Sequence, residues 1–138
     1  MAGAPMKDTA ESPPFTIGRI AVVEGDRSVA EMLHTFFRVM GIEAVVVAPG
    51  EWPPEGVAAT VCRLGPQAVV LDGDLPNLRA LDIARAIRAS EPALPIVLTA
   101  RNPAAAPSVA GFTIARRPTE RFEELLDLLE VVLEDVEG

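Results

Sequence analysis

Short apolar runs alternate with segments of helical periodicity along most of this 138-residue sequence. The run RIAVV, residues 19–23, is apolar and β-branched almost throughout, as in a strand buried on both faces of a parallel sheet. The next segment spaces its apolar residues as a helix does, with Ser28 and Glu31 at capping-box spacing and Gly41 as a C-terminal stop. Strands that alternate with helix-length crossovers form parallel sheets covered by helices on both faces. We therefore predict strands at 19–23, 42–48, 67–72, 94–100 and 112–115, and helices at 28–41, 53–64, 77–90 and from Thr119 onward.

The length and composition indicate a single domain with a hydrophobic core. Hydrophobic residues make up 49% of the sequence, which excludes general disorder, and no apolar run is long enough to cross a bilayer. Residues 1–16 are rich in Pro, Ala and Ser, so we expect a flexible leader before a domain at 17–138 in a soluble, cytoplasmic protein. The formal charge of −8 disfavours nucleic acid as a direct partner, because phosphate binding needs a basic face. Cys62 is the single cysteine, which excludes an internal disulfide and a thiolate metal cage.

Polar residues follow the ends of the predicted strands. In open α/β sheets, ligands bind beyond the carboxyl ends of the strands, near the point where the strand order reverses. Asp72 and Asp74 follow the third predicted strand, within the stretch VVLDGDLPN. The same rule selects Glu24, Gly25 and Asp26 after the first strand, Thr99 after the fourth and Arg117 after the fifth. We expect these residues to gather at one edge of the sheet.

Four segments resemble the response-regulator receiver domains of bacterial two-component systems: RIAVVEGDRSVAEML, VVLDGDLPN, PIVLTA and ARRP. The resemblance runs from about Arg19 to Val136. It implies a flavodoxin-like (CheY-like) doubly wound sheet of five parallel strands, which accepts a phosphoryl group from a histidine kinase. The phosphoacceptor would be Asp72, followed by Pro76 at the family's spacing. The resemblance assigns phosphate contacts to Thr99, Ala100 and Arg117, and Mg²⁺ binding to Glu24, Asp72 and the main-chain carbonyl of Asp74.

The expected metal site is short of one carboxylate. Attack of a carboxylate on a phosphoryl group needs a divalent cation to neutralise the phosphoryl oxygens, and Mg²⁺ takes oxygen ligands. In receiver domains an acidic pair follows the first strand, and here that pair falls on Glu24 and Gly25. Unless the longer side chain of Glu24 or the neighbouring Asp26 reaches inward, the second acidic ligand is missing. We therefore expect Mg²⁺ binding to be weak or lost.

Two further departures from the family lie around Arg117. The lysine that normally precedes the proline after the fifth strand is Arg117 here, and its planar guanidinium could form a permanent ion pair with Asp72. The interval between Thr99 and Arg117 is shorter than in the family and contains Pro103 and Pro107, so we expect the fourth helix of the fold to be shortened or lost. In the family, that helix commonly belongs to the surface that passes the signal to a partner, so we expect this surface to be changed here.

Three functions fit these residues. The preferred hypothesis is a single-domain receiver in a phosphorelay, with Asp72 as phosphoacceptor at an impaired or atypical site and a histidine kinase or other signalling protein as partner. The second is a pseudo-receiver that binds partners independently of phosphorylation. The third is a phosphatase of the haloacid-dehalogenase type, because DGDL resembles the D-x-D nucleophile motif of those enzymes. No later acidic pair supplies the metal ligands of such an enzyme, so we expect no enzymatic activity. The oligomeric state stays open.

Two other features allow more than one interpretation. Trp52, within PGEWPPEG, fits either an exposed contact residue or a cap on the core. The acid-rich segment at residues 119–138 fits a solvated helix face, with an acidic docking surface as the alternative. His34 lies off the apolar stripe of its predicted helix and is expected at the edge of the solvent.

Overall fold

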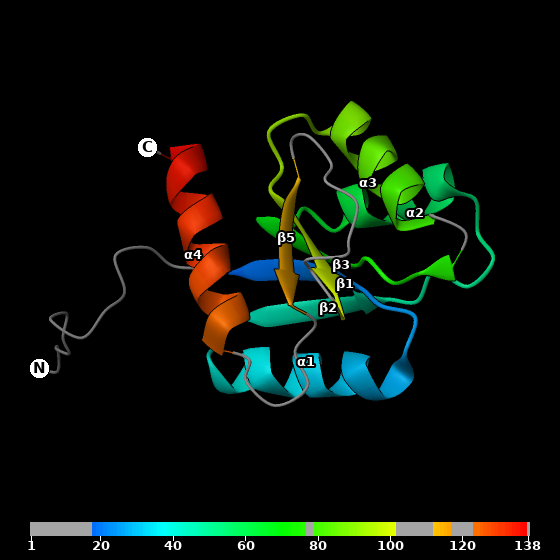
Figure 1. The fold of residues 1–138 in the computed structure, drawn as a ribbon. Helices are drawn as coiled ribbons and strands as arrows, with labels where there is room; N and C mark the ends of the chain where they lie inside the picture. Colours follow the sequence, from blue (N-terminus) through cyan, green and yellow to red (C-terminus); the bar gives the residue numbers. More distant parts are fainter. Residues whose placement is uncertain (1–17, 77–78, 102–111, 117–122, 138) are drawn as a thin grey trace, which may run out of the picture.

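The computed structural model describes residues 18–76, 79–101, 112–116 and 123–137. They form a five-stranded sheet in the order β2-β1-β3-β4-β5, and every neighbouring pair of strands is parallel (Figure 1). The strands are β1 (Arg19–Val23), β2 (Glu43–Val47), β3 (Ala68–Asp72), β4 (Ile96–Ala100) and β5 (Thr113–Arg116). The helices are α1 (Arg27–Val39), α2 (Pro54–Arg63), α3 (Arg79–Ser90) and α4 (Glu123–Glu137). The flavodoxin-like, doubly wound parallel sheet predicted from the sequence is confirmed.

Several of the predictions fall on parts of the chain that the structure does not describe. The shortened or lost fourth helix was expected between β4 and β5, where residues 102–111 lie outside the described ranges. The leader at 1–16, the predicted helix starts at Asn77 and Thr119, and Arg117 also lie outside them. These predictions therefore stay predictions.

Helices cover both faces of the sheet and bury its side chains in two clusters. Alternate residues of β1 point to opposite faces, so Ala21 and Val23 belong to one cluster and Ile20 and Val22 to the other. The first cluster packs against α2 and α3, and the second against α1 and α4 (Figure 1). Every residue of β3 and β4 is buried, whereas β2 at the edge of the sheet has buried, half-buried and exposed positions. This burial explains why the central strands read as continuous apolar runs.

Polar contacts join several segments at the amino edge of the sheet. The Arg19 guanidinium donates from Nε to Oε1 of Glu43 at 2.9 Å, and from Nη1 to the carbonyl oxygen of Leu64 at 2.6 Å. The side-chain oxygen of Gln67 accepts hydrogen bonds from the main-chain N–H groups of Gly18 and Arg19. These contacts connect β1 to β2 and to the segment that leads into β3.

The N-terminus of α1 is capped by Asp26 and not by Ser28, so the predicted capping box is wrong. Oδ1 of Asp26 accepts hydrogen bonds from the main-chain N–H groups of Ser28 at 2.9 Å and Val29 at 3.2 Å. The backbone of Asp26 is extended, as an N-cap residue requires, and Ser28 already lies in the first helical turn. None of the described helices has the length and apolar character needed to span a membrane.

Replacing Asp26 by Ala is expected to lower the free energy of unfolding by about 1 kcal/mol, because two N–H groups of the first turn lose their acceptor. The matched substitution Ser28→Ala should change it by less than about half of that, since Ser28 is not the cap. Chemical denaturation of the two variants beside the parent protein measures both effects. An equal or larger loss for Ser28→Ala would contradict the assignment of the cap.

Candidate functional site

Three buried polar side chains lie where the central strands end. Among the described residues, the buried polar or charged side chains are those of Glu24, Asp72 and Thr99, with exposed fractions of 4%, 5% and 1%. Asp72 ends β3 and pairs in register with Thr99 of β4, while Glu24 directly follows β1, the other neighbour of β3. Burial of a carboxylate is unfavourable unless hydrogen bonds or charges compensate it. Core packing therefore does not explain these residues, and they mark this edge as the candidate site.

Main-chain N–H groups hold both carboxylates. Oδ1 of Asp72 accepts a hydrogen bond from the N–H of Asp74 at 2.9 Å, and Oδ2 accepts one from the N–H of Gly25 at 3.3 Å. Oε2 of Glu24 accepts from the N–H of Asp26 at 3.0 Å. Hydrogen bonds to an ionised acceptor are stronger than neutral ones. Asp72 therefore connects the β1–α1 loop to the turn that follows β3.

Leu75 occupies the space next to Gly25. A Cβ atom added to Gly25 would lie 2.9 Å from Cδ2 of Leu75 and 3.6 Å from Oδ2 of Asp72. The Leu75 side chain is buried, with an exposed fraction of 8%. A side chain at position 25 would therefore begin in contact with the apolar Leu75 and close to Asp72.

The turn after β3 is attached to the end of β4 by two hydrogen bonds. The N–H of Gly73 donates to the carbonyl oxygen of Thr99 at 2.7 Å, and the N–H of Arg101 donates to Oδ2 of Asp74 at 3.0 Å. A Cβ atom on Gly73 would lie 2.4 Å from that carbonyl oxygen, so only glycine fits this close approach. The roles of Gly73 and Arg101 were missed by sequence reasoning, although a glycine between two aspartates was a signal for the former.

The predicted site residues separate into those that the structure brings together and those that it does not. Glu24, Asp72, Thr99 and the main chain of Asp74 lie at one edge, together with the buried Ala100 of β4. The Asp74 side chain is exposed, and the Asp26 carboxylate caps α1. No group of three or more His, Cys, Asp or Glu side chains within the described ranges is placed to hold a metal ion.

Two carboxylates, from Glu24 and Asp72, are compatible with a magnesium site. Mg²⁺ is commonly bound through one or two protein carboxylates, with water and phosphate oxygens completing the octahedron. The chemistry of these two side chains fits that pattern, and Gly25 contributes no oxygen from its side chain. They do not supply a closed cage of protein ligands.

Two reactive residue types lie away from this edge. Cys62 on α2 is half-buried, and burial together with the nearby charge of Glu91 raises the pKa of its thiol. A raised pKa keeps the thiol protonated at neutral pH, which disfavours a role as nucleophile. His34 lies exposed on α1, as expected.

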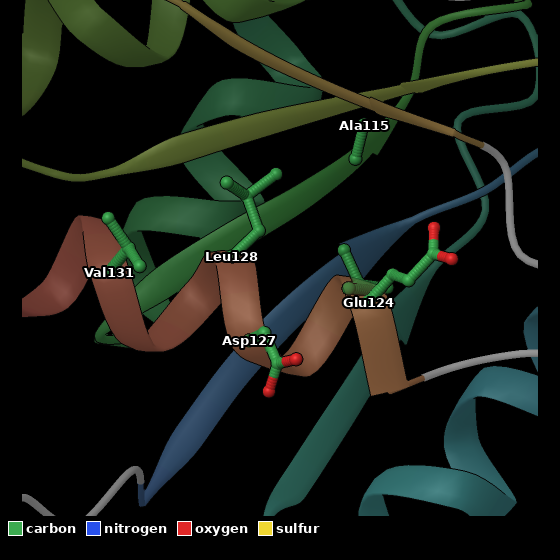
Figure 2. A pocket seen from close by; sticks show the side chains of 6 residues that line it. Ala115, Glu124, Asp127, Leu128 and Val131 are labelled. Carbon is green, nitrogen blue, oxygen red and sulfur yellow. The ribbon is translucent and has the colours of Figure 1, made fainter.

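A separate groove of about 380 Å³ lies between β5 and α4. Figure 2 shows the side chains that line it, which are Ala115, Glu124, Leu125, Asp127, Leu128 and Val131. It shares no lining residue with the edge around Asp72. The acidic docking surface considered for this helix stays a prediction.

Sequence comparison points to one class of protein, although no protein-family model matches the chain. The DNA-binding response regulator MtrA of Mycobacterium tuberculosis is 35% identical over 84 residues, which are 61% of this chain and 35% of MtrA. The probable transcriptional regulatory protein TcrX of the same organism is 30% identical over 104 residues, 75% of this chain and 42% of TcrX. This chain is a homologue of response-regulator receiver domains. It spans between about a third and two fifths of the length of these curated relatives.

Solved structures share the fold of this receiver homologue. A putative response regulator from Chloroflexus aurantiacus has a TM-score of 0.69 at 24% identity, over 86% of this chain and 99% of that one. The response regulator TrrA of Thermotoga maritima, in complex with Mg²⁺ and BeF, has a TM-score of 0.68 at 20% identity, over 84% and 99% of the two chains. The same protein bound to the histidine kinase ThkA has a TM-score of 0.70 at 20% identity, over 85% and 99%. At these identities the likeness concerns the fold alone.

Proposed function

We propose that the chain is a receiver module of two-component signalling, which accepts a phosphoryl group on Asp72 at a site with weakened metal binding. The observation that carries this proposal is the burial of Asp72 at the end of β3, between β1 and β4 and in register with Thr99. The homology to receiver domains and the position of Asp72 at the end of β3 support the same role.

The proposed reaction needs a nucleophile, a neutralising charge and a place for the phosphoryl oxygens. An oxygen of Asp72 would attack the phosphorus of a phosphohistidine, so that an O–P bond forms, the P–N bond breaks and the histidine takes up a proton. Thr99, in register with Asp72 on β4, has a hydroxyl that could donate to a phosphoryl oxygen. Arg117 stays a proposed contact, since it lies outside the described residues.

Mg²⁺ would be held by Glu24, Asp72 and the main-chain carbonyl of Asp74, with Asp26 as a less favourable ligand because it caps α1. When bound, the cation would neutralise charge on the phosphoryl oxygens. Gly25 removes one acidic ligand, so we expect this binding to be weaker than with a second acid at that position.

The partner that this role requires is a histidine kinase or another phosphodonor protein. TrrA binds the histidine kinase ThkA, and for this chain we propose a partner of the same class. MtrA is named as a DNA-binding protein, but the match covers 35% of its length. We propose no direct nucleic-acid contact for this chain because its formal charge is −8. A cytoplasmic site of action and the absence of catalytic turnover are further parts of the proposal.

One observation favours a second function, a module that binds partners without phosphorylation. Cδ2 of Leu75 lies 2.9 Å from where a Cβ atom at position 25 would be, and each oxygen of Asp72 accepts a hydrogen bond from a main-chain N–H group. A carboxylate has about four lone-pair sites, so these bonds do not by themselves prevent attack on phosphorus, but they stabilise the ionised carboxylate and lower its nucleophilicity. Phosphorylation could therefore be slow enough to have no part in signalling.

Incubation of the full chain with Mg²⁺ and acetyl phosphate is expected to add the mass of one phosphoryl group, as read by intact-protein mass spectrometry. The adduct should be absent from Asp72→Asn and present in the control Asp82→Asn, which changes an exposed aspartate of α3. Because we expect metal binding to be weak, the yield should keep rising as the Mg²⁺ concentration is increased instead of reaching an early plateau.

The absence of an adduct at every Mg²⁺ concentration would contradict phosphorylation and favour the second function. Turnover of a generic phosphate ester that is lost in both Asp72→Asn and Asp74→Asn would instead support the phosphatase hypothesis. In the proposed receiver the Asp74 side chain is not a metal ligand, and its Oδ2 accepts a hydrogen bond from the N–H of Arg101, so Asp74→Asn should keep the adduct.

A further inference from the structure

The loop between β2 and α2 contains a closed turn with Trp52, the single tryptophan of the chain. The N–H of Trp52 donates to the carbonyl oxygen of Pro49 at 3.0 Å, which closes the turn. Gly50 has a φ of +53°, a conformation that other L-residues rarely adopt. Pro53 and Pro54 follow, with fixed φ angles, and Pro54 begins α2. The main chain on both sides of Trp52 is therefore restricted; we call residues 49–53 the Trp52 turn.

Arg79 holds the Trp52 turn from a distant part of the sequence. Its Nη1 donates to the carbonyl oxygen of Gly50, and its Nη2 to that of Trp52, both at 2.6 Å. The two donors of one planar guanidinium match two main-chain acceptors, which fixes the orientation of the turn as well as its position. Arg79 is the first residue of α3, so this contact also attaches the turn to the segment that follows Asp72.

The tryptophan itself is not used as a core residue. Half of its surface, 50%, is exposed, and it is the one aromatic residue among the exposed large hydrophobic side chains of the described ranges. Its neighbours Glu51 and Glu55 are exposed carboxylates. Tryptophan is enriched among residues that dominate protein interfaces, and an anchor that is rigid before binding loses little conformational entropy on binding. The acidic neighbours favour a partner with positive charge.

The position of the turn relates it to the candidate site. β1, β2 and β3 are parallel, so the loop after β2 lies at the same edge of the sheet as Glu24 and Asp72. The N–H of Glu24 also donates to the carbonyl oxygen of Val47, the last residue of β2, at 3.3 Å.

We propose that the Trp52 turn is a docking surface for a protein segment that combines apolar side chains with lysine or arginine. Trp52 packs against the apolar side chains of this segment, and Glu51 and Glu55 pair with its cations. Arg79 is a positioning residue that keeps the turn in its binding conformation. Docking here requires no phosphoryl group on Asp72, so a test of this docking surface is independent of the test of the proposed function.

The test is selection of peptides from a phage-displayed random library against the full chain, followed by affinity measurement with fluorescently labelled copies of the peptides recovered. We expect recovered peptides to be rich in apolar and basic residues and to bind about tenfold or more weakly to Trp52→Ala. The control Val39→Ala removes an exposed apolar side chain from α1 and should leave the affinity unchanged. The double variant Glu51→Gln, Glu55→Gln should weaken binding and reduce its dependence on salt.

Arg79→Lys separates positioning from contact, because lysine keeps the charge but cannot donate to both carbonyl groups. It should weaken peptide binding about threefold or more while Trp52 is still present. Failure to recover peptides, or equal affinity for the parent chain and Trp52→Ala, would overturn the docking surface. So would a dimer of the full chain that disappears in Trp52→Ala by sedimentation velocity, because the occupant would then be a second copy.

Discussion

Gly73→Ala is expected to lower the free energy of unfolding by roughly 3 kcal/mol, the largest effect on stability among the substitutions considered. The added Cβ would lie 2.4 Å from the main-chain carbonyl oxygen of Thr99, far inside the contact distance of carbon and oxygen. This oxygen belongs to a central, buried strand and cannot rotate away as a side chain could. The turn after β3 would have to move, and the hydrogen bond from Gly73 to Thr99 would lengthen from 2.7 Å.

Chemical denaturation followed by circular dichroism measures this loss, and Gly56→Ala is its matched control. Gly56 lies within α2, where an added Cβ would make ordinary contacts of 3.8 Å with Pro53. Alanine is the better helix former, so the control should stabilise the protein by about 0.5 to 1 kcal/mol. A loss for Gly73→Ala no larger than about 1 kcal/mol would show that the close approach of the two strand ends is not maintained in solution.

Gly25→Asp is expected to raise the affinity for Mg²⁺ by about tenfold or more, because it adds a third carboxylate beside Glu24 and Asp72. The new Cβ would meet Cδ2 of Leu75 at 2.9 Å, and this methyl group belongs to the end of a flexible side chain that can rotate. In the absence of metal the variant should be less stable than the parent, because three carboxylates then repel one another at one edge.

Isothermal titration calorimetry with Mg²⁺ measures the change in affinity, and thermal unfolding with and without Mg²⁺ measures its linkage to stability. Leu75→Ala alone controls for the removal of the neighbouring side chain. It should not raise the affinity for Mg²⁺, because it adds no ligand. The double variant Gly25→Asp, Leu75→Ala should bind at least as tightly as Gly25→Asp. If neither variant with Asp at position 25 binds more tightly, the missing acid does not explain weak metal binding.

Local sequence patterns predicted the elements of this fold well because their causes are local. A strand buried on both faces must be apolar at consecutive positions, and β1 was found at its predicted bounds, Arg19–Val23. The predicted N-cap of α1 was wrong because Asp26 and Ser28 are both good N-cap residues and lie two positions apart. Which of them caps the helix depends on the path of the backbone after Glu24. Short-range sequence patterns do not specify the path of the backbone there.

Contacts between segments distant in sequence could not be predicted in the same way. The gathering of acidic residues at the ends of β1 and β3 followed from the rule for parallel sheets, and Glu24 and Asp72 lie there. The close approach of Gly73 to Thr99 depends on the register of β3 against β4, which no sequence pattern specifies. The two hydrogen bonds from Arg79 to the Trp52 turn likewise depend on how α3 packs beside α2.

The polar contacts of Arg19 and Gln67 have a consequence for where this molecule can change shape. They tie β1 to β2 and to the start of β3 at the end of the sheet remote from Asp72. Because these contacts hold the starts of the three strands together, the strands have little freedom to slide or to separate at that end of the sheet. A chemical change at Asp72 would therefore be accommodated by repositioning of the connecting segments at its own rim.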